Sequence, residues 1–317
     1  MEVSVHTGNF IKLFGYKEGC RMIRDAGFDG IDLNFNDAWN QAEIRRGKLG
    51  HCIFEEDMNA VLKHYESAFS EIEKSGLKIL QAHAPFPSYV AGYPEINKRT
   101  PKIYENCIYL CGEKKIPYLV IHGISREYDG SDMTKEEEID KNIELYSSMI
   151  PSLLETGVMV LLENIFWDVE GKAYDATCSD SCEAADLIDK LNEIAGYEAF
   201  GLCFDVGHNN LLCWEMDDYL RKLGKRVKAL HIHDNDGRGD WHGIPCSGTV
   251  DWVKFCTVLS EIGYNGTLNF ETFSYYDLKR IAPSAVPVLL RYIADMGKAF
   301  GKDIEKLKKT LDKQKNG

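Results

Sequence analysis

The stretch from residue 158 to residue 205 opens with the apolar run VMVLLE (158–163), continues through the helix-patterned segment SCEAADLIDKLNEIAG (181–196) and closes with the apolar run GLCFD (201–205). A buried strand, a helix and a second buried strand form the unit from which parallel sheets are built. Both runs end on a carboxylate, Glu163 and Asp205. The stretch therefore predicts a parallel α/β fold with acidic side chains at the ends of its strands.

Six further runs follow the same pattern. Each is short and apolar and stops on a polar, mostly metal-binding side chain; they are EVSVH (2–6), DGIDL (29–33) followed by Asn34, KILQAH (78–83), YLVIH (118–122), KALHIH (228–233) and TLNFE (267–271). Apolar strands that alternate with helices are typical of a parallel sheet covered on both faces. We therefore predict a single (β/α)8 TIM barrel over residues 1–317, with residues 300–317 as a peripheral helix.

The bulk composition agrees with a soluble barrel. The chain of 317 residues is 44% hydrophobic and 27% charged, and single α/β barrels of about 250 to 400 residues are ordinary. The N-terminal MEVSVHTGNF lacks a targeting pattern and no apolar stretch approaches membrane-spanning length. We therefore expect a cytoplasmic protein with no membrane partner. The C-x3-C spacing of Cys107/Cys111 and Cys178/Cys182 differs from the C-x2-C of zinc and redox motifs, so we expect these cysteines to be structural.

The net charge of −13 is the most informative bulk figure. Nucleic-acid binders gain affinity by placing Lys and Arg against phosphates, whereas an acidic protein repels a polyanion. The clearest basic stretch, KAFGKDIEKLKKTLDKQKNG (298–317), has the pattern of a solvated final helix. The sequence therefore predicts a small-molecule substrate and no nucleic-acid partner.

Long irregular stretches extend the C-terminal face of the predicted barrel. They follow the second, third, fifth and seventh strands, at residues 34–54, 84–100, 164–180 and 234–250, while the connections on the other face are short. Their aromatic residues include Phe86, Tyr89, Trp167 and Trp241. We expect these side chains to separate a small polar substrate from water, although loops with small cores of their own would also contain such aromatics.

Four consecutive predicted strands end on metal-binding side chains: Glu163, Asp205, His231 and Glu271. We call these residues the quartet. An oxygen-rich set of this kind suits Mn²⁺ or Mg²⁺ and would also take Co²⁺ or Zn²⁺. Charged groups at the end of apolar runs are costly to bury unpaired. None of the eight runs ends with a Lys or Arg that could pair with them. The quartet therefore predicts one divalent metal.

A second group of potential ligands accompanies the quartet. We call it the outer set: His83, His122, His208, Asp240 and His242. Because one metal cannot bind nine ligands, we expect the outer set to contact substrate or to hold further metals. His233 points to the same side of its strand as His231 and is expected to lie behind the ligands. His6 suits either the barrel floor or a core position, and His51 and His64 are expected to be structural.

In this order, the motifs resemble the xylose-isomerase-like barrels, a superfamily that joins sugar isomerases and epimerases with the type IV apurinic endonucleases. The resemblance covers nearly the whole chain. It rests on LQAHAPF (80–86), VIHG (120–123), LLENIF (161–166), CFDVGHNN (203–210), LHIHDNDGRGDWHGIPCSGTVDW (230–252) and LNFET (268–272).

The resemblance implies a metal-dependent sugar isomerase or epimerase. In the family's epimerases the quartet positions hold one divalent metal, here expected to be Mn²⁺, and residues like Glu163 and Glu271 donate and accept the proton. A residue like His208 contacts one substrate oxygen, and an arginine like Arg238 holds another hydroxyl. Proton removal beside a carbonyl requires a base and a stabilised ene-diolate, and a divalent ion supplies that stabilisation.

The resemblance also implies an alternative. The type IV apurinic endonucleases bind three zinc ions, and their ligand pattern corresponds to the quartet plus the outer set, so additional Zn²⁺ is expected if the outer set is occupied. The segment PCSGTVDW departs at Cys246 from the family's P-G-x-G-I-D-W. The acidic net charge favours a small sugar over a DNA phosphodiester. Two further alternatives stay open. One is a metal-dependent lyase or dehydratase acting on a sugar or glycoside. The other is a non-catalytic barrel, either homo-oligomeric or serving as a partner subunit.

Overall fold

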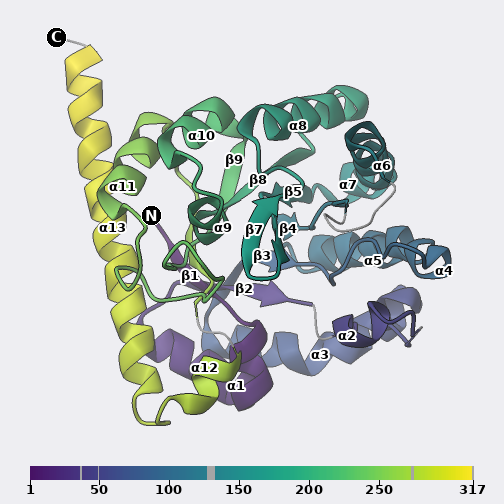
Figure 1. Cartoon of the computed structure of the whole chain (residues 1–317). Helices are drawn as coiled ribbons and strands as arrows, with labels where there is room; N and C mark the ends of the chain where they lie inside the picture. Colours follow the sequence, from purple (N-terminus) through teal and green to yellow (C-terminus); the bar gives the residue numbers. More distant parts are fainter. Residues whose placement is uncertain (36–37, 49, 127–132, 273–274, 316–317) are drawn as a thin grey trace.

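Figure 1 shows a computed structural model of the chain, which describes residues 1–35, 38–48, 50–126, 133–272 and 275–315. Eight parallel strands form one sheet in the order β10-β1-β2-β3-β4-β5-β8-β9. A parallel bridge between Ile232 and Phe270 joins the two edges, so the sheet curls into a (β/α)8 barrel. The strands are β1 (Val3–His6), β2 (Gly30–Asn34), β3 (Lys78–His83), β4 (Tyr118–Val120), β5 (Met159–Glu163), β8 (Phe200–Asp205), β9 (Val227–His231) and β10 (Leu268–Phe270).

The barrel confirms the fold class predicted from the eight apolar runs, since each run overlaps one of the eight strands. The polar residues lie at the C-terminal ends as expected. His83, Glu163 and His231 are the last residues of their strands, whereas His122 lies two residues beyond β4 and Glu271 one residue beyond β10. Because all eight strands are parallel, these side chains meet at one mouth of the barrel.

Helices cover the outside of the barrel (Figure 1). The ends of several follow from local sequence: Asp57 and Asp180 cap the N-termini of α3 and α8 with their side chains, and Gly76 and Gly196 end the same helices with left-handed φ of 77°. The main helices are α1 (Gly8–Ala26), α3 (Met58–Ser75), α5 (Thr100–Glu113), α6 (Lys135–Ser147), α7 (Ile150–Thr156), α8 (Ser181–Ala195), α10 (Met216–Leu223), α11 (Trp252–Glu261) and α13 (Val286–Lys315). Shorter ones are α2 (Gln41–Ile44), η2 (Ile53–Glu55), α4 (Pro94–Asn97), α9 (Val206–Leu211), η3 (Gly224–Arg226) and α12 (Tyr275–Arg280).

The segment after β5 is more regular than the sequence suggested. It forms an antiparallel hairpin of β6 (Phe166–Val169) and β7 (Lys172–Asp175). The two turn residues, Glu170 and Gly171, have φ of 54° and 77°, as a tight two-residue hairpin turn requires. The hairpin rises from the barrel mouth directly after Glu163, so it forms one wall above the site.

The final helix is longer than the sequence predicted. Residues 300–315 of the predicted peripheral helix (300–317) are the second half of α13, which begins at Val286 and packs against α1 and α11; residues 316–317 lie outside the described residues. Ile293 and Ile304 are fully buried, and the Phe300 ring stacks on Trp252 with centroids 5.2 Å apart. The helix therefore completes the outer layer of the barrel, while its last turns extend beyond the body (Figure 1). Among the described residues, we find no helix that combines the length and the apolar character needed to cross a membrane.

Candidate metal centre and substrate cavity

The quartet lies on four neighbouring strands, β5, β8, β9 and β10. Nδ1 of His231 is 3.0 Å from Glu163 Oε1 and 3.1 Å from Glu271 Oε2. The same nitrogen is 4.0 Å from Asp205 Oδ2. Atoms that bind one divalent ion at about 2.1 Å are separated from each other by about 3 to 4 Å. The distances from His231 to the three carboxylates thus match the spacing of ligands around one ion.

The charges of the quartet also fit a cation. Glu163 and Asp205 are buried, and the side chain of Glu271 is 16% exposed. In the described parts of the chain, the ion pairs of these three carboxylates are all with histidines and none is with Lys or Arg. Glu163 Oε2 is buried without a hydrogen bond. Because buried carboxylates need compensation, the donor set fits a divalent metal ion.

The pKa shifts of Glu163 and His83 are consistent with this role. Burial alone would raise the pKa of Glu163, but the imidazoles of His231 and His122 outweigh it and hold this pKa well below its usual value. Burial lowers the pKa of His83 to about 3, and His122 acts in the same direction. Glu163 is therefore an anion and His83 a neutral imidazole, which are the protonation states that bind metals.

A polar layer beneath the quartet was not anticipated from the sequence. Asp32 is fully buried, and its Oδ2 accepts hydrogen bonds from Gln81 Nε2 at 2.9 Å and Asn269 Nδ2 at 3.1 Å. The same oxygen is 3.3 Å from Nε2 of His231. If Nδ1 of His231 bound a metal, its ring proton would be on Nε2, and Asp32 would be the acceptor within reach. The available signal was a charged residue inside the apolar run DGIDL.

The structure divides the outer set into two clusters on either side of the quartet. In the first, Nε2 of His83 and Nε2 of His122 are 2.8 Å apart. Glu163 Oε2 is 3.0 Å from the His122 nitrogen and 3.8 Å from the His83 nitrogen. Glu163 thus belongs both to the quartet and to a second group of three potential ligands.

The second cluster lies around Asp240, in the loop after β9. Asp240 Oδ2 is 3.0 Å from Nε2 of His242 and 3.9 Å from Nε2 of His208. Burial would lower the pKa of His242, but the adjacent Asp240 outweighs it and the pKa rises to about 10. His233 is fully buried behind these residues, with Nε2 3.1 Å from Asp205 Oδ1. All five outer-set residues therefore lie at the mouth, as the sequence predicted.

The segment D-V-G-H, from Asp205 to His208, has a glycine at position 207 for a steric reason. A Cβ atom at this position would lie 1.9 Å from the His233 ring, so the close packing requires glycine. At Cys246, where the chain departs from the family pattern, the backbone adopts the left-handed φ of 69° that glycine favours.

The remaining histidines, His6, His51 and His64, differ in how close they lie to the quartet. Nε2 of His6 is 2.6 Å from Asn34 Nδ2, and its Nδ1 is 3.9 Å from Glu271 Oε1, so His6 borders the quartet. His51 is exposed and pairs with Glu56. His64 lies on α3, outside the mouth.

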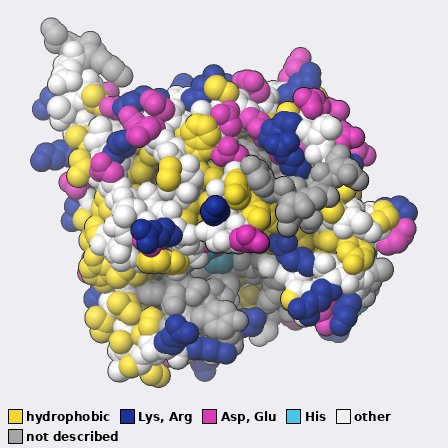
Figure 2. Space-filling model, in the orientation of Figure 1, with side chains coloured by type: hydrophobic (Ala, Val, Ile, Leu, Met, Phe, Trp, Pro, Cys, Tyr) yellow, Lys and Arg dark blue, Asp and Glu magenta, His cyan; other side chains and the backbone are white. Residues whose placement is uncertain are grey.

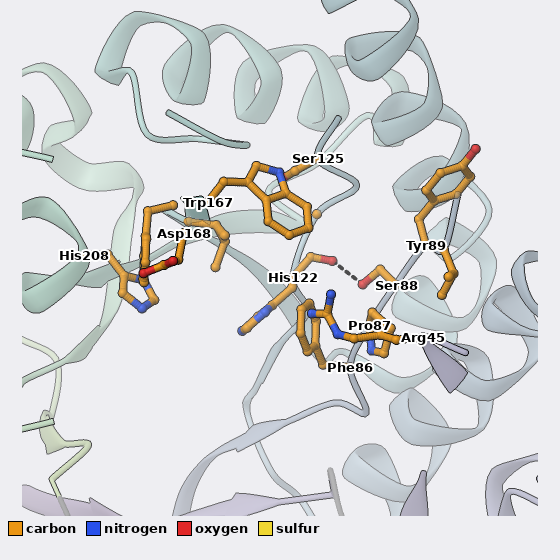
Figure 3. A pocket seen from close by; sticks show the side chains of 14 residues that line it. Arg45, Phe86, Pro87, Ser88, Tyr89, His122, Ser125, Trp167, Asp168 and His208 are labelled. Atoms are coloured by element: carbon orange, nitrogen blue, oxygen red, sulfur yellow. Dashed lines mark hydrogen bonds between the residues drawn. The ribbon is translucent and has the colours of Figure 1, made fainter. Parts of the chain in front are cut away.

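A cavity of about 520 Å³ opens beside the quartet (Figure 3). It is lined by His122 and His208 of the outer set and by none of the quartet, so it lies to one side of the quartet. Phe86, Tyr89 and Trp167 line it, as predicted. Trp241 does not line it and is 51% exposed, so the expectation that this residue shields the substrate is not met.

Two charged residues of the cavity wall were missed by sequence reasoning, and one predicted residue lies outside it. Arg45, in the loop after β2, and Asp168, on β6, both line the cavity. Neither belongs to a strand end, so no periodic signal marks them. The Arg238 side chain is exposed and does not line the cavity, and its predicted contact with a substrate hydroxyl stays a prediction.

Comparisons with known proteins agree with this architecture. A sequence model of the xylose isomerase-like TIM barrel family matches residues 20–312. The chain is 39% identical over 72 residues to an uncharacterised protein of Sinorhizobium fredii. This match covers 23% of each protein. It is 27% identical over 95 residues to the fructoselysine 3-epimerase of Escherichia coli O157:H7. This match covers 30% of this chain and 34% of that protein.

Among solved structures, a D-tagatose 3-epimerase-like protein superposes with a TM-score of 0.68 at 16% identity, covering 98% of this chain and 100% of that chain. At this identity the superposition establishes a common fold. The sequence matches to the curated relatives span less than half of those proteins' lengths.

Proposed function

The chain belongs to the xylose isomerase-like TIM barrel family, and on this premise we propose that it is a divalent-metal-dependent sugar isomerase or epimerase. The observation that carries the proposal is the position of Glu163 and Glu271, which both lie within 3.1 Å of one nitrogen of His231. Their strands are the two outer ones of the four that carry the quartet. Two carboxylates thus face one small region of the mouth. The names of the epimerase relatives support the same reaction class.

The quartet would hold the ion, for which we expect Mn²⁺, with Mg²⁺, Co²⁺ or Zn²⁺ as alternatives. When bound, a divalent ion stabilises the negative charge that develops on substrate oxygens as a proton leaves the neighbouring carbon. Asp32 acts from below by fixing the ring of His231, whereas Asp205 supplies a fully buried carboxylate that is held by the backbone N–H of His208.

Glu163 and Glu271 would move the proton. Their pKa values are held well below normal because, although burial raises them, nearby histidines lower them more: His231 and His122 for Glu163, and His6 and His231 for Glu271. Both are therefore ionised and able to accept a proton. If one glutamate removes the proton from one face of a carbon and the other returns it to the opposite face, the carbon is inverted. Return of the proton to the adjacent carbon gives isomerisation instead.

Solvent exchange tests this proposal. Mn²⁺-loaded protein is incubated with a panel of ketoses, inososes and glycosides in deuterated buffer, and NMR detects incorporation beside the carbonyl. We expect exchange in the wild type and its loss in Glu271→Gln and Glu163→Gln, with the melting temperature measured to confirm folding. His51→Gln, on the exposed surface, is the control. Full exchange in a folded Glu271→Gln variant would contradict the assignment of that carboxylate.

A three-zinc phosphodiesterase acting on abasic DNA is the second candidate. The observation in its favour is the assembly of both outer-set clusters beside the quartet. Against it, the net charge is −13, and acidic and basic side chains are interspersed over the coloured part of the face in Figure 2. Three zinc ions per chain with cleavage of abasic duplex DNA would favour this candidate.

Loss of water or of an aglycone from a sugar, seen in the NMR spectra of the exchange experiment, would instead indicate a dehydratase or lyase.

Sugar binding without exchange would indicate a non-catalytic barrel. A cytoplasmic location and assembly into a homo-oligomer or with a partner subunit stay predictions from the sequence.

A further inference from the structure

The cavity beside the quartet is larger than a single free sugar requires. Its volume of about 520 Å³ falls in the range of about 300 to 1,000 Å³ typical of sites for drug-sized ligands. The cavity borders the quartet through two residues of the outer set, His122 and His208. Figure 3 shows Tyr89 on the opposite side of the view from His208. None of Glu163, Asp205, His231 and Glu271 lines the cavity, so a sugar that reacts next to Glu163 would leave much of it empty.

Much of the cavity lining has the wrong chemistry for sugar hydroxyls. One wall comes from the segment that enters the hairpin, with Ile165, Phe166 and Trp167, and another from the loop after β3, with Phe86 and Val90. Hydroxyl groups placed against such side chains lose hydrogen bonds to water and gain none in return. An apolar or aromatic group would instead gain from burial and from contact with the rings.

The charges around this wall select against a cationic group. The Arg45 guanidinium lies 5.2 Å from the centroid of the Phe86 ring, and Lys141 Nζ lies 5.8 Å from that of Tyr89. Both rings therefore already face a positive charge. A positively charged substituent would be repelled by these two side chains, with Asp168 as the single carboxylate among the described lining residues.

We propose that the substrate is a sugar bearing an uncharged apolar or aromatic substituent, with the sugar beside Glu163 and the substituent between the Trp167 wall and the Phe86 wall. The inference rests on the proposed function and specifies its substrate class. It makes the hairpin β6–β7 a specificity element.

Matched probe pairs test the substituent. The first pair is D-fructose and 1-anilino-1-deoxy-D-fructose, and the second is 3-keto-D-glucose and its phenyl β-glycoside. Within each pair the carbonyl and the adjacent C–H are the same. We expect the substituted member of at least one pair to exchange with a kcat/KM at least tenfold higher. The 1-(4-aminobutylamino) derivative of fructose, which adds a positive charge, should exchange less well than the anilino derivative, and the reverse order would overturn the charge argument.

Variants locate the effect. Trp167→Ala should reduce the ratio of substituted to free kcat/KM at least tenfold, and Phe86→Leu provides a milder change if the first variant folds poorly. Trp241→Ala, in an exposed residue outside the cavity, is the matched control and should keep the wild-type ratio. An unchanged ratio in both folded cavity variants would overturn the placement of the substituent.

Direct binding separates this inference from the proposed reaction. Calorimetry with Mn²⁺-loaded protein measures the Kd of each probe whether or not exchange occurs. Absence of exchange with every probe would refute the proposed function. Equal Kd values for the two members of both pairs would refute the inference about the substituent, even in an active enzyme.

Discussion

Replacing Asp32 with asparagine should weaken metal binding although Asp32 is not a ligand. Its Oδ2 accepts hydrogen bonds from Gln81 and Asn269 and lies 3.3 Å from Nε2 of His231. When Nδ1 of His231 binds the ion, the ring proton on Nε2 points at this carboxylate, which raises the basicity of the ligand nitrogen. A neutral amide provides a weaker acceptor and holds the ring less firmly.

The expected size of the effect follows from these contacts. Loss of an outer partner of a metal-binding histidine typically weakens metal affinity by about 10- to 100-fold, or about 1.4 to 2.7 kcal/mol of binding free energy. Asp32 Oδ1 is buried without a hydrogen-bond partner among the described residues. The asparagine NH₂ group would occupy that place unpaired, which lowers the free energy of unfolding by about 1 to 3 kcal/mol.

Titration calorimetry of chelator-treated protein with Mn²⁺ at pH 7 measures the affinity, and urea unfolding measures the stability. The matched control is Asp29→Asn, the same substitution at the opposite end of the barrel, where the carboxylate accepts a hydrogen bond from the backbone N–H of Val3. The control should bind Mn²⁺ as the wild type does. A wild-type Kd in folded Asp32→Asn would refute the reasoning.

Three further predictions concern packing and charge. Gly207→Ala should lower the free energy of unfolding by about 1 to 3 kcal/mol through overpacking, because the new Cβ would lie 1.9 Å from the His233 ring; an unchanged urea midpoint would contradict this contact. In metal-free protein, His242 has a pKa raised to about 10, so the folded state keeps a proton that the unfolded state loses near its usual pKa of about 6.5. Stability should therefore fall as pH rises from about 6.5 to 10, and a urea midpoint that rises over this interval would be inconsistent with a protonated His242. Ile293→Ala, in the buried face of α13, should cost about 2 to 5 kcal/mol of unfolding free energy, whereas Val288→Ala, at a 67% exposed position, should stay within about 0.5 kcal/mol; equal costs would show that α13 does not stabilise the barrel.

Local sequence was sufficient for the barrel and for the ligands at its mouth. Each strand is marked in the sequence by a short apolar run, and each quartet residue lies at or directly after the end of a strand. Parallel strands bring these ends to one face, so residues as distant in sequence as Glu163 and Glu271 could be grouped before any coordinates. The hairpin and the first half of α13 were missed because their apolar residues pack against partners that no local period reveals.

The sequence by itself determined that the carboxylates and imidazoles converge at one end of a barrel, since that follows from strand direction alone. The tertiary structure decided what surrounds them. It placed Asp32 beneath His231 and divided the outer set into two clusters. It also opened the cavity toward Trp167 and Arg45 and left Trp241 and Arg238 exposed. These features depend on side-chain directions and on long loops, which are determined by contacts between residues far apart in the chain.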